Sequence, residues 1–409
     1  MQYFKKYFLV CFMLFCLGLT GFLSGSNIAK TEVKAEVKAE VETEKPQNLI
    51  EENAKLKGKF SQFEDMLSDK FVGKVEIVEQ YGAFQRILRK TMVDDPVTYR
   101  RVFKGDGGML YYIIPEKDVN DEAVLAMKKL KEDIAVPIFC ILPPNKNTQE
   151  KASLPNGVLD YSVLNENELY DRLSNIGIKT LSLSREYIKE KKSEKETFYM
   201  TDTHWRNETA FWAYQRSLKF LEKEMFVKFH NADKSNSLKN YKLEKFKGIY
   251  IGSMGKRVGK EYIEQKDDYT LIIPKFDTKY TYIKYDENYK VKSEKKGSFE
   301  EVFVNRWVIS DKNEYTDKYI TMMDYGAPYE VIVNDKIDAG VSLVIIRDSF
   351  AMPFSAYLAS NVKHIYMFDT RYENIRRTLR EKIEEVSPDA VLLLCNSSSA
   401  YYFDDMFEF

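Results

Sequence analysis

Short apolar runs alternate with amphipathic stretches along much of the chain. In the C-terminal third the apolar runs are residues 342–346, 364–368 and 390–395, and the amphipathic stretches are 350–360 and 372–386. The alternation begins earlier, with helix-like stretches at 123–134 and 164–176 and strand-like runs at 136–142 and 178–183. Such a pattern predicts an α/β fold, in which crossover helices join parallel strands. The three C-terminal strands are expected to lie in one parallel sheet.

Residues 230–340 have a different pattern, in which Tyr, Thr and Lys alternate with apolar residues. This alternation favours half-exposed antiparallel strands, inserted into the α/β domain. The strand-like runs are residues 269–273, 280–285, 302–309 and 329–333. Core packing is the more frequent role of such aromatic side chains, so no site residue is predicted in this β-rich insertion.

An apolar run at residues 7–23 approaches the lower limit of about 17 residues for crossing a bilayer. Lys5 and Lys6 precede it, which keeps the N-terminus in the cytoplasm and places the rest of the chain outside. Residues 1–26 are therefore a membrane anchor or a cleaved signal segment. The anchor is favoured because residues 26–29 make a poor cleavage site.

The remaining sequence divides into three parts. Residues 27–48 repeat a short unit rich in Lys and Glu, which is typical of a charged spacer. Residues 49–95 have mostly helical spacing of apolar positions and predict a helical lead-in. Residues 96–409 form the predicted catalytic domain, within which the β-rich insertion lies.

Composition limits which classes of partner and which kinds of site the chain can have. The 62 basic and 63 acidic residues nearly cancel, so nothing favours nucleic acid, and a neutral or sugar-like partner fits more easily. No spacing of His, Cys or carboxylates matches a metal site, and no cofactor is predicted. Cys140 and Cys395 each end or follow an apolar run and are either free buried thiols or one disulfide.

His204 is one of only three histidines, and it follows Asp202 by two residues. In an extended backbone, residues two apart point to the same side. Asp202 is therefore predicted to accept a hydrogen bond from Nδ1 of His204, which leaves Nε2 to act as a base. The alternative is a structural histidine in a loop before a helix.

Ser349 lies between the apolar run 342–346 and the amphipathic stretch 350–360. This places it at the carboxyl end of a predicted parallel strand, the edge at which open α/β sheets bind ligands. The amides at the start of the following helix favour attack by its hydroxyl, because they stabilise a developing oxyanion. The alternative is a serine that only caps the helix.

Six segments carry a resemblance to a known family: residues 69–74, 102–107, 142–146, 201–205, 248–255 and 347–350. The Asp-Thr-His-Trp and Asp-Ser-Phe sequences within them are specific as a pair. With these segments the chain resembles the SGNH-like acetyltransferases of the alginate O-acetylation type, and most closely the exported DHHW proteins of Gram-positive bacteria. The resemblance implies an SGNH-hydrolase-like parallel sheet flanked by helices.

The resemblance also implies an activity. In such proteins the Asp-x-His segment supplies an orienting carboxylate and a base, and the Asp-Ser segment supplies the nucleophile. Asp202, His204 and Ser349 occupy these positions here. The implied reaction is O-acetylation of a cell-surface polysaccharide through an acetyl-serine, with a multi-spanning membrane acyltransferase as the acetyl donor. The implied location is the outer face of the cell membrane, or outside the cell if the first segment is cleaved.

Two positions depart from the family pattern. Arg347 stands where many relatives have Gly, and it is either a structural replacement or a substrate-binding residue. Thr203 stands where the name DHHW implies His, and it is expected to point away from Ser349. Asn145, at the end of a predicted strand, is a candidate oxyanion donor and substrate contact.

Two other functions remain open. A carbohydrate esterase uses the same three residues with water as the second nucleophile. A non-catalytic surface or export scaffold keeps the fold without the reaction, although the presence of all three residues argues against it.

Overall fold

The computed structural model describes residues 74–94, 100–116, 121–147, 154–190, 192–399 and 404–409. Residues 75–409 form one compact unit. The predicted anchor, the charged spacer and residues 49–73 of the lead-in lie outside the described residues. Among the helices of the described part, none is both long enough and apolar enough to cross a bilayer.

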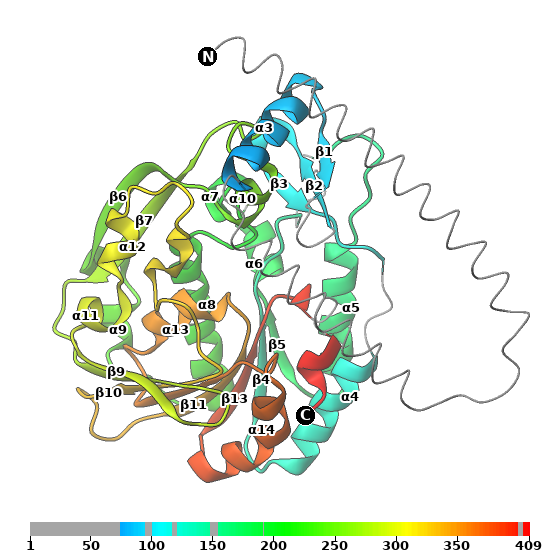
Figure 1. The fold of residues 1–409 in the computed structure, drawn as a ribbon. Coiled ribbons are helices and arrows are strands. Elements are labelled where there is room, and N and C mark those ends of the chain that lie inside the picture. The colour runs from blue at the N-terminus through cyan, green and yellow to red at the C-terminus, as the bar shows by residue number, and fades with distance from the viewer. Residues whose placement is uncertain (1–73, 95–99, 117–120, 148–153, 191, 400–403) are drawn as a thin grey trace, which may run out of the picture. The chain divides into compact units, whose positions relative to one another are not determined.

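An eight-stranded sheet forms the centre of the fold (Figure 1). Its strands lie in the order β5 (Lys179–Ser182), β4 (Ile138–Leu142), β13 (Ala390–Leu394), β11 (Ser342–Arg347), β12 (His364–Phe368), β10 (Tyr329–Asn334), β8 (Tyr280–Tyr285) and β9 (Val291–Gly297). The first five strands are parallel, and the last three add in antiparallel fashion. The predicted parallel sheet of the three C-terminal strands is confirmed.

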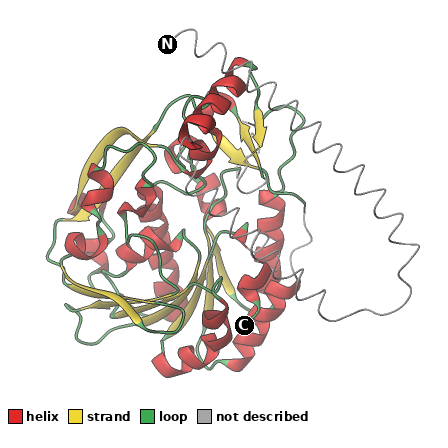
Figure 2. Cartoon of the chain, in the orientation of Figure 1, coloured by secondary structure: helices red, strands yellow, loops and turns green. Residues whose placement is uncertain are grey.

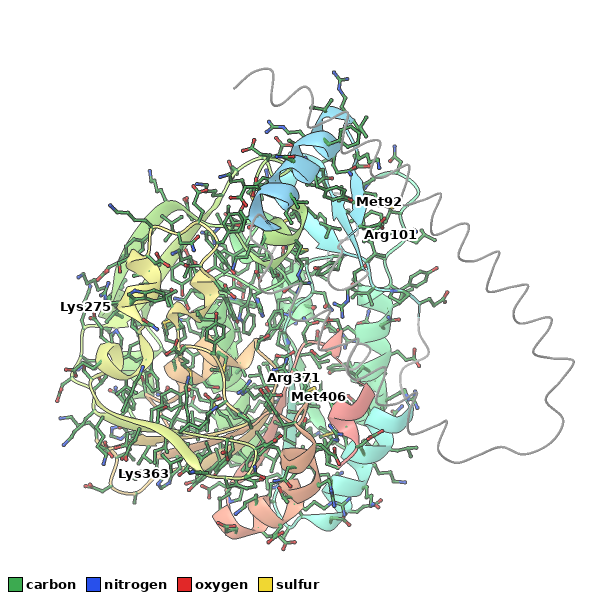
Figure 3. The ribbon with its side chains drawn as sticks, viewed as in Figure 1. Met92, Arg101, Lys275, Lys363, Arg371 and Met406 are labelled. Carbon is green, nitrogen blue, oxygen red and sulfur yellow. The ribbon has the colours of Figure 1, made fainter. Side chains whose placement is uncertain are left out.

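Helices cover both faces of this sheet (Figures 1 and 2). One face packs against α8 (Asn207–Met225) and α13 (Ala351–Leu358), and the other against α4 (Asp121–Asp133), α5 (Ser162–Asn175) and α14 (Glu373–Val386). The central strands are apolar throughout because side chains alternate between two buried faces. Along β11, residues 343 and 345 pack on the first face, and residues 344 and 346 on the second. Side chains fill the space between these layers (Figure 3).

Two smaller sheets adjoin the central one. The first contains β1 (Met92–Asp94), β2 (Arg101–Lys104) and β3 (Leu110–Tyr112), and the second pairs β6 (Tyr241–Tyr250) with β7 (Asp267–Pro274). The helix α3 (Lys74–Ile87) lies within the range 49–95 of the predicted lead-in. The short helices are α6 (Leu183–Lys189), α7 (Glu194–Thr197), α9 (Ala232–Ser235), α10 (Ser253–Val258), η1 (Asp106–Gly108), η2 (Leu238–Asn240), η3 (Lys318–Thr321) and η4 (Asp404–Phe407).

The β-rich insertion differs from its prediction at one of the four runs. The runs 280–285 and 329–333 are the antiparallel strands β8 and β10, which together with β9 extend the central sheet. The run 302–309, predicted as a strand, instead contributes to α11 (Phe299–Phe303) and α12 (Arg306–Ser310). Local caps explain these helices: Ser298 and Glu301 form a capping box, and the side chain of Asn305 accepts from the amide of Val308.

The two cysteines of the central sheet region are free thiols. Cys140 lies on β4 and Cys395 directly follows β13, and both side chains are buried. Burial raises the pKa of each thiol above its ordinary value. The alternative of a disulfide between them is therefore not realised in this structure.

Candidate active site

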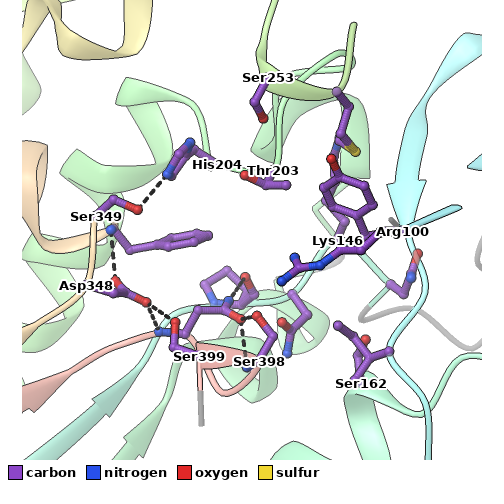
Figure 4. Close-up of a pocket in the computed structure, with 18 of the residues that line it drawn as sticks. Arg100, Lys146, Ser162, Thr203, His204, Ser253, Asp348, Ser349, Ser398 and Ser399 are labelled. Atoms are coloured by element: carbon purple, nitrogen blue, oxygen red, sulfur yellow. Dashed lines mark hydrogen bonds between the residues drawn. The ribbon is translucent and has the colours of Figure 1, made fainter. Parts of the chain in front are cut away.

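A pocket of about 430 Å³ opens at the carboxyl ends of the parallel strands. The segment after β4 contributes Asn145, that after β11 contributes Ser349, that after β12 contributes Arg371, and that after β13 contributes Asn396. This is the edge at which open α/β sheets bind ligands. Residues from β3 and α10, outside the central sheet, complete the pocket wall (Figure 4).

Ser349 lies in the turn between β11 and α13. Its Oγ is 2.7 Å from Nε2 of His204, although the two residues are 145 positions apart in the chain. Asp348 stabilises this turn, because its Oδ1 accepts a hydrogen bond from the backbone amide of Phe350 at 2.9 Å. The Ser349 hydroxyl therefore faces His204 and is not used as the helix cap.

Contacts on several sides hold the imidazole of His204. Nδ1 is 2.5 Å from Oδ1 of Asp202 and donates a hydrogen bond to it. This leaves Nε2 to accept a hydrogen bond from the Ser349 hydroxyl. The ring of Tyr319 stacks on the imidazole with centroids 3.9 Å apart, and Phe350 packs at 5.2 Å. The hydroxyl of Tyr319 also donates to the backbone oxygen of Ser349 at 3.0 Å. Tyr319 thereby contacts both ends of the His204–Ser349 hydrogen bond.

Asp202 is buried, and donors surround its carboxylate. Oδ2 accepts from the hydroxyl of Tyr250 at 2.9 Å and from the amide of Ser253 at 2.5 Å, and Oδ1 also accepts from the backbone amide of His204 at 2.8 Å. The close approach requires Gly252, since a Cβ there would lie 2.2 Å from Cβ of Asp202. These donors keep the carboxylate ionised.

The pKa values of this pair follow from their mutual attraction. Burial alone would raise the pKa of Asp202, but the charge of His204 and the hydrogen bonds hold it well below its usual range. Burial alone would lower the pKa of His204, but the carboxylates of Asp202, Asp317 and Asp348 raise it above its ordinary value. The neutral form of His204, which can act as a base, is therefore favoured only above this raised pKa.

Asp348 links Ser349 to the segment after β13. Its Oδ2 accepts from the backbone amide of Asn396 and from the hydroxyl of Ser399, each at 2.7 Å. The carboxyl is buried, and burial raises its pKa above the ordinary value. Asp348 thus fixes the turn that carries Ser349.

Lys146 fixes the segment that carries Asp202. Its buried ammonium donates to the backbone oxygens of Leu110 (2.7 Å), Met200 (3.3 Å) and Asp202 (2.6 Å). Burial lowers the pKa of Lys146 to about 8, although the nearby carboxylates oppose the shift. This contact ties residues 200–202 to β3.

Asn145 lines the pocket, where it was predicted as an oxyanion donor and substrate contact. Its amide nitrogen donates to Oε2 of Glu166 at 3.2 Å and to Oγ of Ser397 at 2.8 Å. Both amide hydrogens are therefore engaged within the protein, and its role toward a substrate stays a prediction.

Arg347 had two open interpretations, a structural replacement or a substrate-binding residue, and its surroundings favour the first. Its side chain is 1% exposed and binds Oε2 of Glu330 at 2.6 Å, Oδ2 of Asp369 at 3.1 Å and the backbone oxygen of Ala327 at 2.7 Å. As the last residue of β11, it follows the two-residue alternation of the strand and points into a face of the sheet. It is a structural residue.

Several residues at the site lie in the region where none was predicted. Tyr250 contacts Asp202, and Tyr319 contacts His204. Ser253 lines the pocket beside them. The segment 248–255 had carried part of the family resemblance and so contained a signal for Tyr250 and Ser253. Thr203 was expected to point away from Ser349, yet it lines the same pocket (Figure 4).

The fold is similar to several solved structures. A DHHW family protein from Eubacterium siraeum is 19% identical with a TM-score of 0.54, covering 76% of this chain and 95% of that one. PatB1 from Bacillus cereus, in a structure with a sulfonyl adduct, is 19% identical with a TM-score of 0.59, covering 75% of this chain and 97% of that one. The O-acetyltransferase domain of AlgJ from Pseudomonas putida is 10% identical with a TM-score of 0.44, covering 75% of this chain and 98% of that one.

By sequence, no family model and no curated protein matches the chain at a significant level. The predicted resemblance to DHHW proteins is confirmed at the level of the fold.

Proposed function

We propose that this chain, which shares the fold of a DHHW protein, is a serine-dependent O-acetyltransferase acting on a cell-surface polysaccharide. One observation carries the proposal: the unbroken hydrogen-bond chain from Ser349 through His204 to Asp202 in a pocket. An imidazole oriented by a buried carboxylate is the arrangement that activates a serine hydroxyl.

In the first step, Nε2 of His204 takes the proton of Ser349 Oγ as this oxygen attacks the acetyl carbonyl of the donor. Collapse of the tetrahedral intermediate breaks the bond to the leaving group, which receives the proton from His204. The product is an acetyl ester of Ser349. Asp202 stays ionised and stabilises the imidazolium that forms.

In the second step, a sugar hydroxyl takes the place of the leaving group. Nε2 of His204 removes the proton of this hydroxyl as its oxygen attacks the ester carbonyl. The bond to Ser349 Oγ breaks, and Oγ recovers the proton from His204. The acetyl group is then on the sugar, and the enzyme is ready for another cycle.

The apolar residues 7–23 are part of the proposal. They hold the catalytic domain outside the cell on the membrane surface, with residues 27–48 as a spacer. In that position the domain receives acetyl groups from a multi-spanning membrane acyltransferase, which transfers them across the bilayer.

The test uses the full chain with an aryl acetate and an oligosaccharide acceptor. We expect a mass increase of one acetyl group on the peptide containing Ser349. Ser349→Ala should lower turnover at least about 10³-fold, because no other group replaces the nucleophile. The matched variant Ser310→Ala, at an exposed serine of α12, should keep the activity.

The outcomes distinguish the competing functions. Transfer to the oligosaccharide that outruns hydrolysis supports a transferase. Rapid hydrolysis unaffected by the acceptor would instead identify an esterase. If Ser349→Ala left polymer acetylation in cells unchanged while deletion of the gene abolished it, the protein would be a scaffold.

A further inference from the structure

A second cavity, of about 480 Å³, lies at the same edge of the central sheet as the pocket of Ser349. Its walls come from the β8–β9 hairpin, the segment before β10 and the segment after β12. Tyr329 pairs with Tyr285 of β8 and with Phe368 of β12, and Phe368 pairs with Ile346 of β11, so these strand ends are level. β10 and β11 are two strands apart, about 10 Å at the usual spacing.

Two exposed tyrosines line the second cavity. Tyr325 is 68% exposed and Tyr372 is 40% exposed. Within the described part of the chain, neither ring stacks on another aromatic ring, whereas Tyr285 and Tyr329 on the adjoining strands pack together at 5.0 Å. Single exposed aromatic residues are common on protein surfaces. Two of them in one cavity offer apolar faces that a single ligand can contact.

The backbone that carries Tyr325 is fixed at several points. The ammonium of Lys284 donates to the backbone oxygens of Met323 at 2.9 Å and of Tyr325 at 2.6 Å. Two residues further on, the backbone oxygen of Ala327 accepts from Nη2 of Arg347 at 2.7 Å. The ring of Tyr325 is therefore exposed on a fixed support, which lowers the entropy that a ligand loses by ordering the protein.

Tyr372 is held in a similar way at the start of α14. Its backbone amide donates to the oxygen of Asp369 at 3.2 Å, and its backbone oxygen accepts from the amide of Arg376 at 3.1 Å. The residue before it, Arg371, lines the pocket of Ser349. Consecutive residues thus line the two cavities, which makes the cavities neighbours along the edge of the sheet.

The β8–β9 hairpin supplies the polar side of the second cavity, with Asp286, Glu287, Lys292 and Ser293. Carboxylates accept hydrogen bonds from hydroxyls, and ammonium and hydroxyl groups donate to oxygens. The two carboxylates are balanced by the ammonium groups of Lys284 and Lys292, so the lining favours a neutral ligand. A pyranose unit suits such a lining, because its C–H faces are apolar and its hydroxyls project from the edge of the ring.

We propose that Tyr325 and Tyr372 form a second sugar-binding site, which holds a neutral pyranose unit of the acceptor while another unit of the same polymer presents a hydroxyl to Ser349. The inference rests on the proposed transfer at Ser349, whose acceptor is a polymer and extends beyond one pocket. The volume of about 480 Å³ lies within the range of about 300–1,000 Å³ typical of small-ligand sites. The enzyme then prefers long acceptors to short ones.

The test measures equilibrium binding against acceptor length, which does not depend on acyl transfer. The full chain, in a non-ionic detergent, is titrated calorimetrically with the dimer and the hexamer of N-acetylglucosamine and of β-1,4-linked glucose. Wild type and Ser349→Ala are both measured. We expect at least one hexamer to bind at least about tenfold more tightly than its dimer, because only the longer chain occupies both cavities at once.

Tyr325→Ala and Tyr372→Ala should each weaken hexamer binding about three- to tenfold, the loss expected for one aromatic contact, and lower the ratio of hexamer to dimer affinity. Tyr325→Phe and Tyr372→Phe keep the ring and should bind the hexamer nearly as wild type does. Trp307→Ala, at a tryptophan of α12 that is 67% exposed, is the matched control and should bind as wild type. Thermal unfolding verifies that each variant is folded.

Equal affinity for dimer and hexamer of both sugars, wild-type hexamer affinity in both alanine variants, an equal loss in Trp307→Ala, or no saturable binding of either hexamer would overturn the second site. If an aryl acetate acetylates Ser349 while hexamer binding ignores both tyrosines, the proposed function stands and the second site fails. If the tyrosines control hexamer binding and Ser349 is never acetylated, the chain binds sugar at this site and the proposed transfer fails.

Discussion

At the scale of single residues, each member of the site depends on a neighbour that defines its role. Asp348 stabilises the turn before α13 by accepting from the amide of Phe350, and the hydroxyl of Ser349 lies 2.7 Å from Nε2 of His204. Tyr319 stacks on His204 and donates to the backbone of Ser349, so one side chain restrains both residues. The alternatives of a loop histidine and a capping serine are both weakened by these contacts.

The raised pKa of His204 predicts how activity depends on pH. Below this pKa the imidazole is protonated and cannot accept the Ser349 proton, so the rate should rise as pH increases through it. Asp202→Asn removes the charge that raises the pKa, so this limb should move to lower pH, while kcat falls by about 10⁴-fold. The measurement is aryl acetate turnover against pH. An unmoved limb in Asp202→Asn would contradict the assignment.

At the scale of elements, the segment before α10 holds the carboxylate of the pair in place. Gly252 passes so close to Asp202 that a Cβ would lie 2.6 Å from its Cα and 2.2 Å from its Cβ. The next residue, Ser253, then places its amide 2.5 Å from Oδ2 of Asp202. The start of a short helix outside the central sheet therefore helps to set the geometry of the Asp202–His204 pair.

Gly252→Ala should displace Asp202, because the added methyl group would lie 2.2 Å from Cβ of Asp202 and 2.6 Å from its Cα and its Oδ2. We expect a loss of about 1–3 kcal/mol in the free energy of unfolding and a larger fall in kcat than in substrate affinity. Lys256→Ala in the same helix is the control. Urea unfolding and aryl acetate turnover give the two quantities, and wild-type turnover in Gly252→Ala would disprove the argument.

At the scale of the whole molecule, a buried ion cluster joins the parallel and antiparallel halves of the central sheet. Arg347 at the end of β11 binds Glu330 on β10 and Asp369 after β12, and Asp369 also binds Arg371 of the pocket wall. The cluster connects the core of the sheet to the site. It gives Arg347 a structural function.

Arg347→Met should destabilise the whole fold, because it leaves the buried carboxylates of Glu330 and Asp369 without their shared partner. We expect a loss of about 3–5 kcal/mol in the free energy of unfolding, measured by urea denaturation. Arg377→Gln removes an exposed pair and should change it by less than about 1 kcal/mol. If Arg347→Met changed the free energy of unfolding as little as Arg377→Gln does, the cluster would contribute little to stability.

The sequence by itself determined the alternation of strands and helices, the spacing of Asp202 and His204, and the place of Ser349 after a strand. These features are local, because each depends on residues within a few positions of one another. The sequence pattern did not predict α11 and α12, where capping side chains overrode an apolar pattern typical of a strand.

Only the tertiary structure decided which segments meet. It brought Ser349 to His204 across 145 positions, added three antiparallel strands to the sheet, buried Arg347 and placed Tyr325 and Tyr372 in one cavity. Contacts between distant segments leave little trace in local periodicity, because many partners satisfy the same pattern. The burial of a charged residue likewise depends on which counter-charges the fold places beside it.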